Sequence, residues 1–192
     1  MNTTQTTENP LGYERIGRLL ASYAIPSIIS LIINSLYNMV DQIFIGQGVG
    51  FLGNGATNII APIATIAIAV ATLFGDGLAA FFSLNLGQGN ADKAAKGVGT
   101  AVIASGMISV IYAVFAFIFL SPLCSIFGAT DNLLPYAVGY GRIIVIGFPF
   151  AIVATVINSA IRTDGSPRYA MFAMMIGAIL NTILDPIFIF VF

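Results

Sequence analysis

Apolar residues along this chain come in long continuous runs instead of alternating with polar ones. A membrane-spanning helix needs about 20 predominantly apolar residues. Five stretches of the sequence meet that length: residues 19–45, 57–82, 98–121, 134–161 and 169–192. An outer-membrane barrel would instead need alternating segments of about ten residues. The pattern therefore predicts an all-α integral membrane protein, a bundle of five transmembrane helices.

Polar and glycine-rich connectors separate these runs: GQGVGFLGNG, SLNLGQGNADKAAKG, SPLCSIFGATDN and RTDGSPR. Successive spans cross in opposite directions, so the connectors alternate between the two sides of the bilayer. Arg142 then falls toward one side, and the other basic residues fall on the opposite side: Arg15, Arg18, Lys93, Lys96, Arg162 and Arg168. Because cytoplasmic loops carry the excess of lysine and arginine, we expect residues 1–16 to be a cytoplasmic tail and residues 17–192 to form the bundle.

Composition excludes several classes of protein. The chain is 58% hydrophobic and 8% charged, against about 45–50% and about 25% in soluble domains. It has no histidine and only one cysteine, Cys124, which argues against zinc clusters and against histidine-dependent nucleophilic catalysis. A net charge of −1 gives no basic patch for nucleic acid. We therefore expect a lipid bilayer as partner, no nucleic acid, no cofactor and no enzymatic activity.

A glycine pattern between the first two spans resembles a nucleotide-binding motif only superficially. Gly48, Gly50 and Gly53 have the spacing G-x-G-x-x-G. That motif binds dinucleotides only when a strand precedes it and a helix follows it in a βαβ unit. Here it lies between two membrane helices, so we interpret it as a flexible turn.

The first span carries a polar stripe. Asn34, Tyr37, Asn38 and Asp41 are spaced i, i+3, i+4 and i+7, which places them on one helical face. Lipid cannot satisfy such groups, so the stripe must face protein or water. Interhelical hydrogen bonding is one interpretation. The carboxylate of Asp41 favours a functional one, because an ionised group in the bilayer is costly unless it is protonated or paired.

The fifth span repeats this arrangement. Asn181 and Asp185 are four residues apart and share a face with Gly177. Pro186 has no N–H to donate to the carbonyl of Thr182, which is then free to bind a cation or a polar neighbour. The alternative is a tolerated proline kink beside a carboxylate that serves only as an interhelical hydrogen-bond partner. We favour a functional site here too.

Depth decides whether the two carboxylates can meet. Asp41 lies just before the outer end of the first span, and Asp185 lies about 25 Å beyond Arg168 at 1.5 Å per residue. Both therefore fall in the outer half of the bilayer. Asn158 lies closer to the cytoplasmic side and is a weaker candidate. Asp76 lies about six residues from the inner end of the second span, where local water can reach it.

Four segments together carry a family resemblance. They are DQIFIG from Asp41, LGQGNADKA in the second connector, RTDGSPR in the fourth and N-x-x-x-D-P in the fifth span. Their order and spacing resemble those of the multidrug and toxic compound extrusion (MATE) family, over residues 13 to 192. The resemblance implies twelve helices in two six-helix lobes. This chain would be most of the first lobe, truncated before the sixth helix and lacking the C-terminal lobe that a full transporter requires.

The resemblance also implies a function. A transporter of this kind is an antiporter in the cell membrane, coupled to H⁺ or Na⁺, which exports organic and often cationic drugs by alternating access. The acidic pair resembles that of the DinF-type branch, in which Asp41, Asn181 and Asp185 would form the cation site, with Asn158 nearby. If Na⁺ is the coupling ion, Asp41 and Asp185 would be its carboxylate ligands. The first helix would bend at Pro26.

Two features qualify the match to the family. One of its site residues lies on the sixth helix, beyond this chain, and Ser166 stands where relatives often carry Asp or Asn. Two alternatives stay open: a flippase of related architecture for lipid-linked oligosaccharides, and a membrane subunit without transport in which the acids are structural. The sequence leaves the substrate spectrum, the coupling ion and the oligomeric state open.

Overall fold

The structure, a computed structural model, describes residues 15–190, so most of the expected N-terminal tail lies outside it. The described residues form helices and no strands. The helices are α1 (Ile16–Gly48), α2 (Phe51–Gly87), α3 (Ala91–Ile118), α4 (Leu120–Ile126), α5 (Leu134–Thr163) and α6 (Pro167–Phe190). All but α4 are long and apolar enough to cross a membrane. The predicted all-α membrane bundle with five spans is confirmed.

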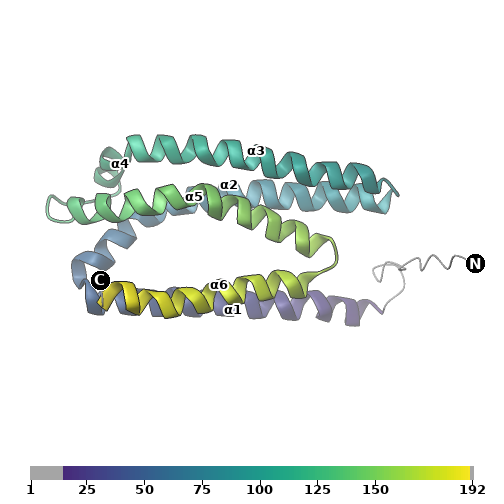
Figure 1. The fold of residues 1–192 in the computed structure, drawn as a ribbon, viewed down its shortest axis with the longest axis horizontal. Coiled ribbons are helices and arrows are strands. Elements are labelled where there is room, and N and C mark those ends of the chain that lie inside the picture. Colours follow the sequence, from purple (N-terminus) through teal and green to yellow (C-terminus); the bar gives the residue numbers. More distant parts are fainter. Residues whose placement is uncertain (1–14, 191–192) are drawn as a thin grey trace, which may run out of the picture.

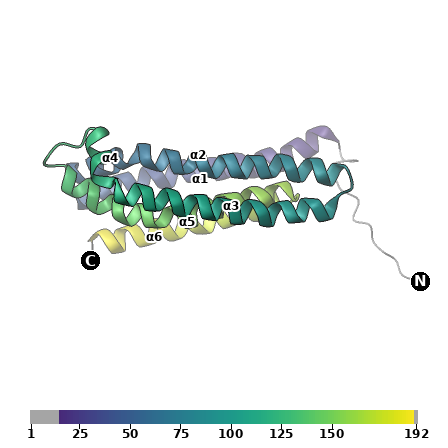
Figure 2. The same cartoon turned by 90° about the horizontal axis from the view of Figure 1, so that it is seen from above.

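The long helices lie in two layers that run along the same axis (Figures 1 and 2). One layer is the pair α1 and α6, and the other contains α2, α3, α4 and α5. α2 starts beside the end of α1 and crosses into the second layer, so it connects the two. The starts of α1, α3 and α6 and the ends of α2 and α5 lie at one end of the bundle. All the basic residues except Arg142 lie at or near this end, as the alternating topology requires.

The helices differ from the predicted spans in several places. α2 starts at Phe51 instead of residue 57, α3 starts at Ala91 instead of residue 98, and the third connector contains the short helix α4. The segment ADKAAKG is too polar for a span, yet alanine and lysine are strong helix formers, so the helix extends beyond the apolar run. α4 has only seven residues, which is below the length that hydropathy detects.

The core of the second layer forms where α2 packs on α5, α3 and α4. Its fully buried members include Ile60 and Ile63 of α2, Leu120 of α4, and Val145 and Ile152 of α5. Small residues allow this close packing. A Cβ added to Gly75 would lie 3.3 Å from the Ser159 Cβ, so the backbones approach there. Ala67, Ala71 and Gly75 are spaced four residues apart on α2, and all three are buried.

Two hydrogen bonds between helices fix how the helices of this layer are oriented against each other. The Tyr112 hydroxyl of α3 donates to the Ile63 carbonyl of α2 over 2.6 Å, and the Tyr112 ring stacks on Phe148. The Ser159 hydroxyl of α5 donates to the Gly75 carbonyl over 3.0 Å. With no water in the hydrocarbon region, each such bond satisfies a group that lipid cannot. These contacts fix α3 and α5 against α2.

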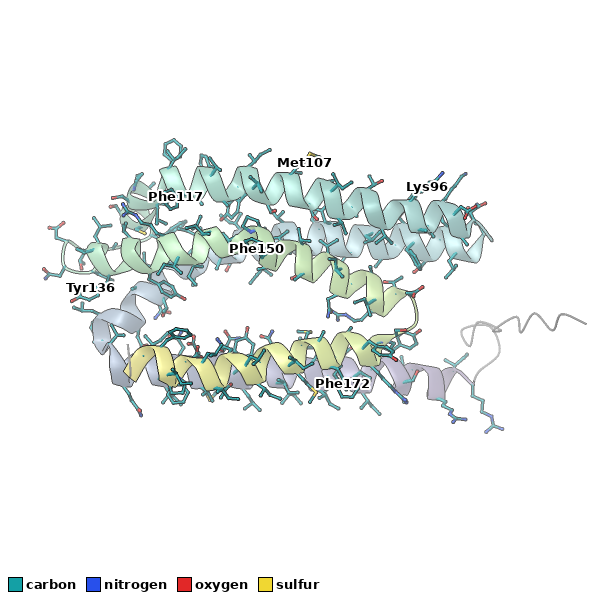
Figure 3. The ribbon with its side chains drawn as sticks, viewed as in Figure 1. Lys96, Met107, Phe117, Tyr136, Phe150 and Phe172 are labelled. Carbon is teal, nitrogen blue, oxygen red and sulfur yellow. The ribbon has the colours of Figure 1, made fainter. Side chains whose placement is uncertain are left out.

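The prolines lie inside continuous helices. Pro26, Pro62, Pro149 and Pro186 are interior residues of α1, α2, α5 and α6, respectively. α5 changes direction near Phe150, beside Pro149 (Figure 3). The bends expected at Pro26 and Pro186 stay predictions.

Large apolar side chains cover the outside of the bundle. Met107 projects outward from α3, and Phe172 projects from α6 on the opposite side of the bundle (Figure 3). Phe172 is 53% exposed and Met107 is 59% exposed. In water such surfaces would be unfavourable, whereas in a bilayer they are the expected lipid-facing residues.

Packing around Gly141 gives a testable prediction. A Cβ at Gly141 would lie 2.6 Å from Ile60 Cδ1 and 3.1 Å from Leu120 Cδ1, whereas a Cβ at Gly139 would meet nothing within 4 Å. Gly141→Leu should therefore destabilise the bundle by about 1–3 kcal/mol, the usual effect of overpacking. Gly139→Leu, on the same helix, should have little effect. Cys124 is fully buried in the same core, so it reacts with a fluorogenic maleimide only when the bundle unfolds. The temperature at which this reaction begins gives the unfolding temperature of each variant. Equal unfolding temperatures for the two variants would contradict this packing.

Candidate cation-binding site

The structure brings together the two intramembrane carboxylates that the sequence singles out. α1 and α6 lie side by side and run in the same direction (Figure 1). Asp41 lies late in α1 and Asp185 lies late in α6, so both are near the end of the bundle away from the basic residues. Their carboxyl groups lie close enough to interact electrostatically.

Asn181 completes the group on α6. Its side-chain nitrogen donates to Asp185 Oδ1 over 3.0 Å, as the four-residue spacing predicts. That bond leaves Asn181 Oδ1 and Asp185 Oδ2, both buried, without a hydrogen-bond partner. Buried polar atoms are normally satisfied, so these two oxygens are available to accept a hydrogen bond or to bind a ligand.

Tyr140 of α5 belongs to the same site, and it is absent from the sequence-based predictions. Its phenol lies within electrostatic range of both Asp41 and Asp185. Tyr140 and Asp41 line a cavity of about 310 Å³, together with residues that include Thr57, Tyr136 and Ile189. Figure 3 shows Tyr136 near the start of α5, at the end of the bundle where α1 meets α2. Through Tyr140 the carboxylate pair faces the second layer.

A polar contact joins α1 and α2 one residue after Asp41. The Thr57 hydroxyl of α2 lies 3.1 Å from Gln42 Oε1, and it also lies 2.9 Å from the Asn54 carbonyl. Gly46 allows this approach, because a Cβ there would be 2.8 Å from Asn54 Nδ2. The contact therefore ties the site to the first turns of α2.

The remaining residues of the α1 stripe do not reach the carboxylate pair. Asn38 donates to the carbonyl and to the side-chain oxygen of Asn34, over 2.7 and 3.0 Å. These two amides thus largely satisfy each other on α1. Tyr37 lines a separate groove between α1 and α6, opposite Thr182 among others. Only Asp41 of the stripe contacts the α6 carboxylate.

Asn158 lies apart from the pair. Its side-chain nitrogen donates to the Ala170 carbonyl over 3.1 Å, and Ala170 precedes Asp185 by about 22 Å along α6 at 1.5 Å per residue. Its Oδ1 is buried and unpartnered. Gly177, which shares a face with Asn181, borders open space instead of a close neighbour.

The side chains of this group offer oxygen atoms as ligands. The described residues hold no cluster of three or more His, Cys, Asp or Glu side chains, which would suit a transition metal. Two carboxylates and an amide oxygen are hard oxygen donors, suited to a hard cation. Asp41, Asp185 and Asn181 would hold such an ion, whose charge would neutralise the repulsion between the carboxylates.

Sequence signals for Tyr140 exist but are weak. Tyr136 and Tyr140 are four residues apart near the outer end of the fourth span, at the depth predicted for Asp41. A phenol hydroxyl inside a bilayer needs a polar partner. That requirement, combined with the depth match, points toward the carboxylates, although apolar neighbours make each tyrosine resemble an ordinary core aromatic.

Comparison with known proteins now identifies the fold. The MatE family model matches residues 26–187. The FAD transporter of Shewanella oneidensis is 29% identical over 175 residues, which are 91% of this chain and 38% of that protein. The multidrug export protein MepA of Staphylococcus haemolyticus is 28% identical over 179 residues, which are 91% of this chain and 39% of that protein.

A solved structure agrees. The outward-facing conformation of a multidrug resistance MATE family transporter of the MOP superfamily has a TM-score of 0.85 and 26% identity, covering 91% of this chain and 38% of that one. The chain thus spans about two fifths of the length of the relatives it matches. Membership of a transporter family agrees with the expectation that the chain is not an enzyme. The chain is a multi-pass membrane protein and belongs to the MatE family of transporters.

Proposed function

We propose that this chain is the cation-coupling lobe of an antiporter that exports small organic molecules in exchange for H⁺ or Na⁺. The observation that carries the proposal is the contact of Asp41 with Asp185 beside the buried, unpartnered oxygens of Asn181 and Asp185. No lysine or arginine among the described residues forms an ion pair with either carboxylate. A mobile cation supplies the missing charge.

The coupling step follows from the repulsion between the two carboxylates. When a proton or Na⁺ is bound, the two acids can stay in contact across α1 and α6. When it leaves, two negative charges face each other in a medium that screens them poorly. The repulsion then favours a different arrangement of α1 against α6. Because Asp41 and Tyr140 line one cavity, that change alters the space between the two layers.

Binding of cation and substrate must oppose each other. If release of the cation favours the conformation that binds the substrate, then binding of the substrate favours release of the cation by the same free energy. This reciprocity turns a downhill cation movement into uphill export. α1 is well placed for it, since it packs mainly on α6 and meets the second layer through the contact of Gln42 with Thr57.

An exposed polar face on α2 supports a water-lined pathway. Polar residues recur along one stripe of this membrane helix and are all exposed: Asn58, Thr65, Thr72, Asp76 and Ser83. α2 continues to Gly87, so Asp76 lies about 16 Å from its end at 1.5 Å per residue, deeper than the sequence suggests. A carboxylate at that depth cannot face lipid. We propose that this face borders the pathway between this lobe and a second one.

The names of the relatives bear on the substrate and on the membrane of this chain. Their names divide between multidrug export and FAD transport, so the proposal is limited to a small organic molecule. We place the chain in the cell membrane with the basic end of the bundle, and hence the N-terminus, in the cytoplasm. A C-terminal lobe is required for transport, because the relatives are more than twice as long as the part that matches.

A flippase for lipid-linked oligosaccharides fits less well. Recognition of a pyrophosphate would need cationic side chains facing the pathway. The basic residues, apart from Arg142, lie at or near one end of the bundle, and the pathway stripe on α2 carries an acid instead. In the other alternative, Asp41 and Asp185 are only structural. The stability of the chain should then not change when H⁺ or Na⁺ is added.

Contact across α1 and α6 can be tested by cross-linking. With Cys124 replaced by alanine, Asp41→Cys with Asp185→Cys should react efficiently with a short bifunctional thiol reagent, since the native side chains are in contact. Asp41→Cys with Asn158→Cys should not, because Asn158 contacts α6 far from Asp185. Protection from a polymer-linked maleimide, read on a gel, measures the linked fraction. Equal linking of both pairs would contradict the arrangement.

Cation dependence of stability tests the site itself. A ligand that binds only the folded state stabilises it, by about 2.7 kcal/mol at 100 times its Kd. Either added Na⁺ or a lower pH should therefore raise the unfolding temperature of the purified chain. The sign follows from repulsion: a cation relieves it, so stability rises as the cation becomes available and falls when it is withdrawn.

Matched variants show whether the change in unfolding temperature arises from the carboxylate pair. Asp41→Asn and Asp185→Asn should each reduce the response strongly, whereas Asp131→Asn, an exposed acid between α4 and α5, should leave it intact. A response that persists in both site variants would rule out this cation site. Absence of any response in the unmodified chain would favour structural acids.

A further inference from the structure

A second cavity lies at the opposite end of the bundle from the carboxylate pair. It has a volume of about 470 Å³ and lies between α2 and α3. Its walls are mostly apolar and include Leu73, Phe74 and Phe81 of α2 and Ala101 and Ala104 of α3. Nothing in the proposed coupling step uses this groove.

Two lysines occupy one end of the groove. Lys93 and Lys96 lie in the first turns of α3 and both line the cavity. They are three residues apart, so their side chains lie on the same face of the helix. Both are exposed, and neither forms an ion pair with a residue in the described range 15–190. Asp92, in the same turn, does not line the groove. The groove thus combines apolar walls with two positively charged lysines in its lining.

The dimensions of the groove match one leaflet of a bilayer. From Lys93 to Ala104 the lining of α3 extends over about 16 Å at 1.5 Å per residue. Half of a hydrocarbon core about 30 Å thick is about 15 Å. Figure 3 shows Lys96 near the start of α3, beside the connection with α2. The lysines are therefore at headgroup level when the apolar walls are at the level of the acyl chains.

Phe81 and Gly97 shape the floor of the groove. A Cβ at Gly97 would lie 2.5 Å from Phe81 Cε1, so only glycine lets the ring lie directly against α3. The Thr100 hydroxyl donates to the Lys96 carbonyl over 3.0 Å and offers no unpaired donor to the channel. Polar recognition in the groove therefore depends on the two lysines alone.

We propose that this groove binds one anionic phospholipid from the leaflet that the α2–α3 connection faces. Its phosphate lies between Lys93 and Lys96, and one acyl chain lies along Leu73, Phe81 and Ala104. An anionic lipid is favoured over a zwitterionic one because the groove presents two positive charges and no negative one. The bound lipid would hold α2 against α3, and the site stands independently of the proposed cation coupling.

The test compares lipids on the full chain in detergent. Native mass spectrometry with added phosphatidylglycerol should detect one retained lipid, and phosphatidylcholine should be retained far less. Since each lysine near an anionic surface contributes roughly a five-fold preference, Lys93→Gln with Lys96→Gln should lose about 30-fold. Both lysines are exposed, so this variant should fold, and its unfolding temperature without added lipid checks that it does.

Two further variants separate a built site from general charge attraction. Arg162→Gln with Arg168→Gln removes two exposed basic residues at the same end of the bundle but outside the groove, and it should retain the lipid. Ala104→Trp fills the apolar part and leaves both lysines, yet should lose it. Equal losses in the arginine and lysine variants, retention in Ala104→Trp, or equal stabilisation by inorganic phosphate alone would each overturn the proposal.

Discussion

Two carboxylates of like charge, in contact inside an apolar bundle, are the constraint on which this structure depends. Asp41 lies on α1 and Asp185 lies on α6, the two helices that pack on each other. The hydrogen bond from Asn181 satisfies one oxygen of Asp185 and leaves the other buried without a partner. In the function proposed above, a bound cation neutralises this pair. The stability of the folded chain would then depend on whether the cation is bound.

The two layers of the fold differ in how tightly their helices are packed against the rest of the bundle. α2, α3 and α5 share a close-packed core fixed by Tyr112 and Ser159, whose hydroxyls bond to carbonyls of α2. α1 and α6 pack chiefly on each other. Repulsion at the carboxylate pair therefore acts within the layer that has fewer contacts with the rest of the bundle. Tyr140, which reaches the pair from α5, is the side chain through which the second layer meets it.

Much of the fold could be predicted because the bilayer imposes a single strong rule on the sequence. Continuous apolar runs identify the five spans, and the two carboxylates stand out because charge is so costly there. Helix ends are less visible, since ADKAAKG forms helix outside the apolar run and α4 is too short to register.

The parts of the site that escaped prediction depend on contacts between helices. Periodicity groups Asn34, Tyr37 and Asn38 with Asp41, but it cannot tell that two amides bond to each other while Tyr37 lines another groove. It also cannot bring Tyr140 to the carboxylates, because that contact depends on how α5 packs across the layers. Depth alone could not place Asn158 against Ala170. Pairing across helices requires the three-dimensional structure.

Direct measurement of cation uptake by the purified chain tests the central claim most sharply. Proton uptake is followed in weakly buffered, sodium-free solution as the pH is lowered from alkaline to neutral, and equilibrium binding of radioactive sodium is measured at alkaline pH. The account predicts one cation per chain, H⁺ or Na⁺, that is lost in Asp41→Asn and in Asp185→Asn alike and retained in Asp131→Asn. Uptake that is unchanged in both site variants, or absent from the unmodified chain, would contradict it.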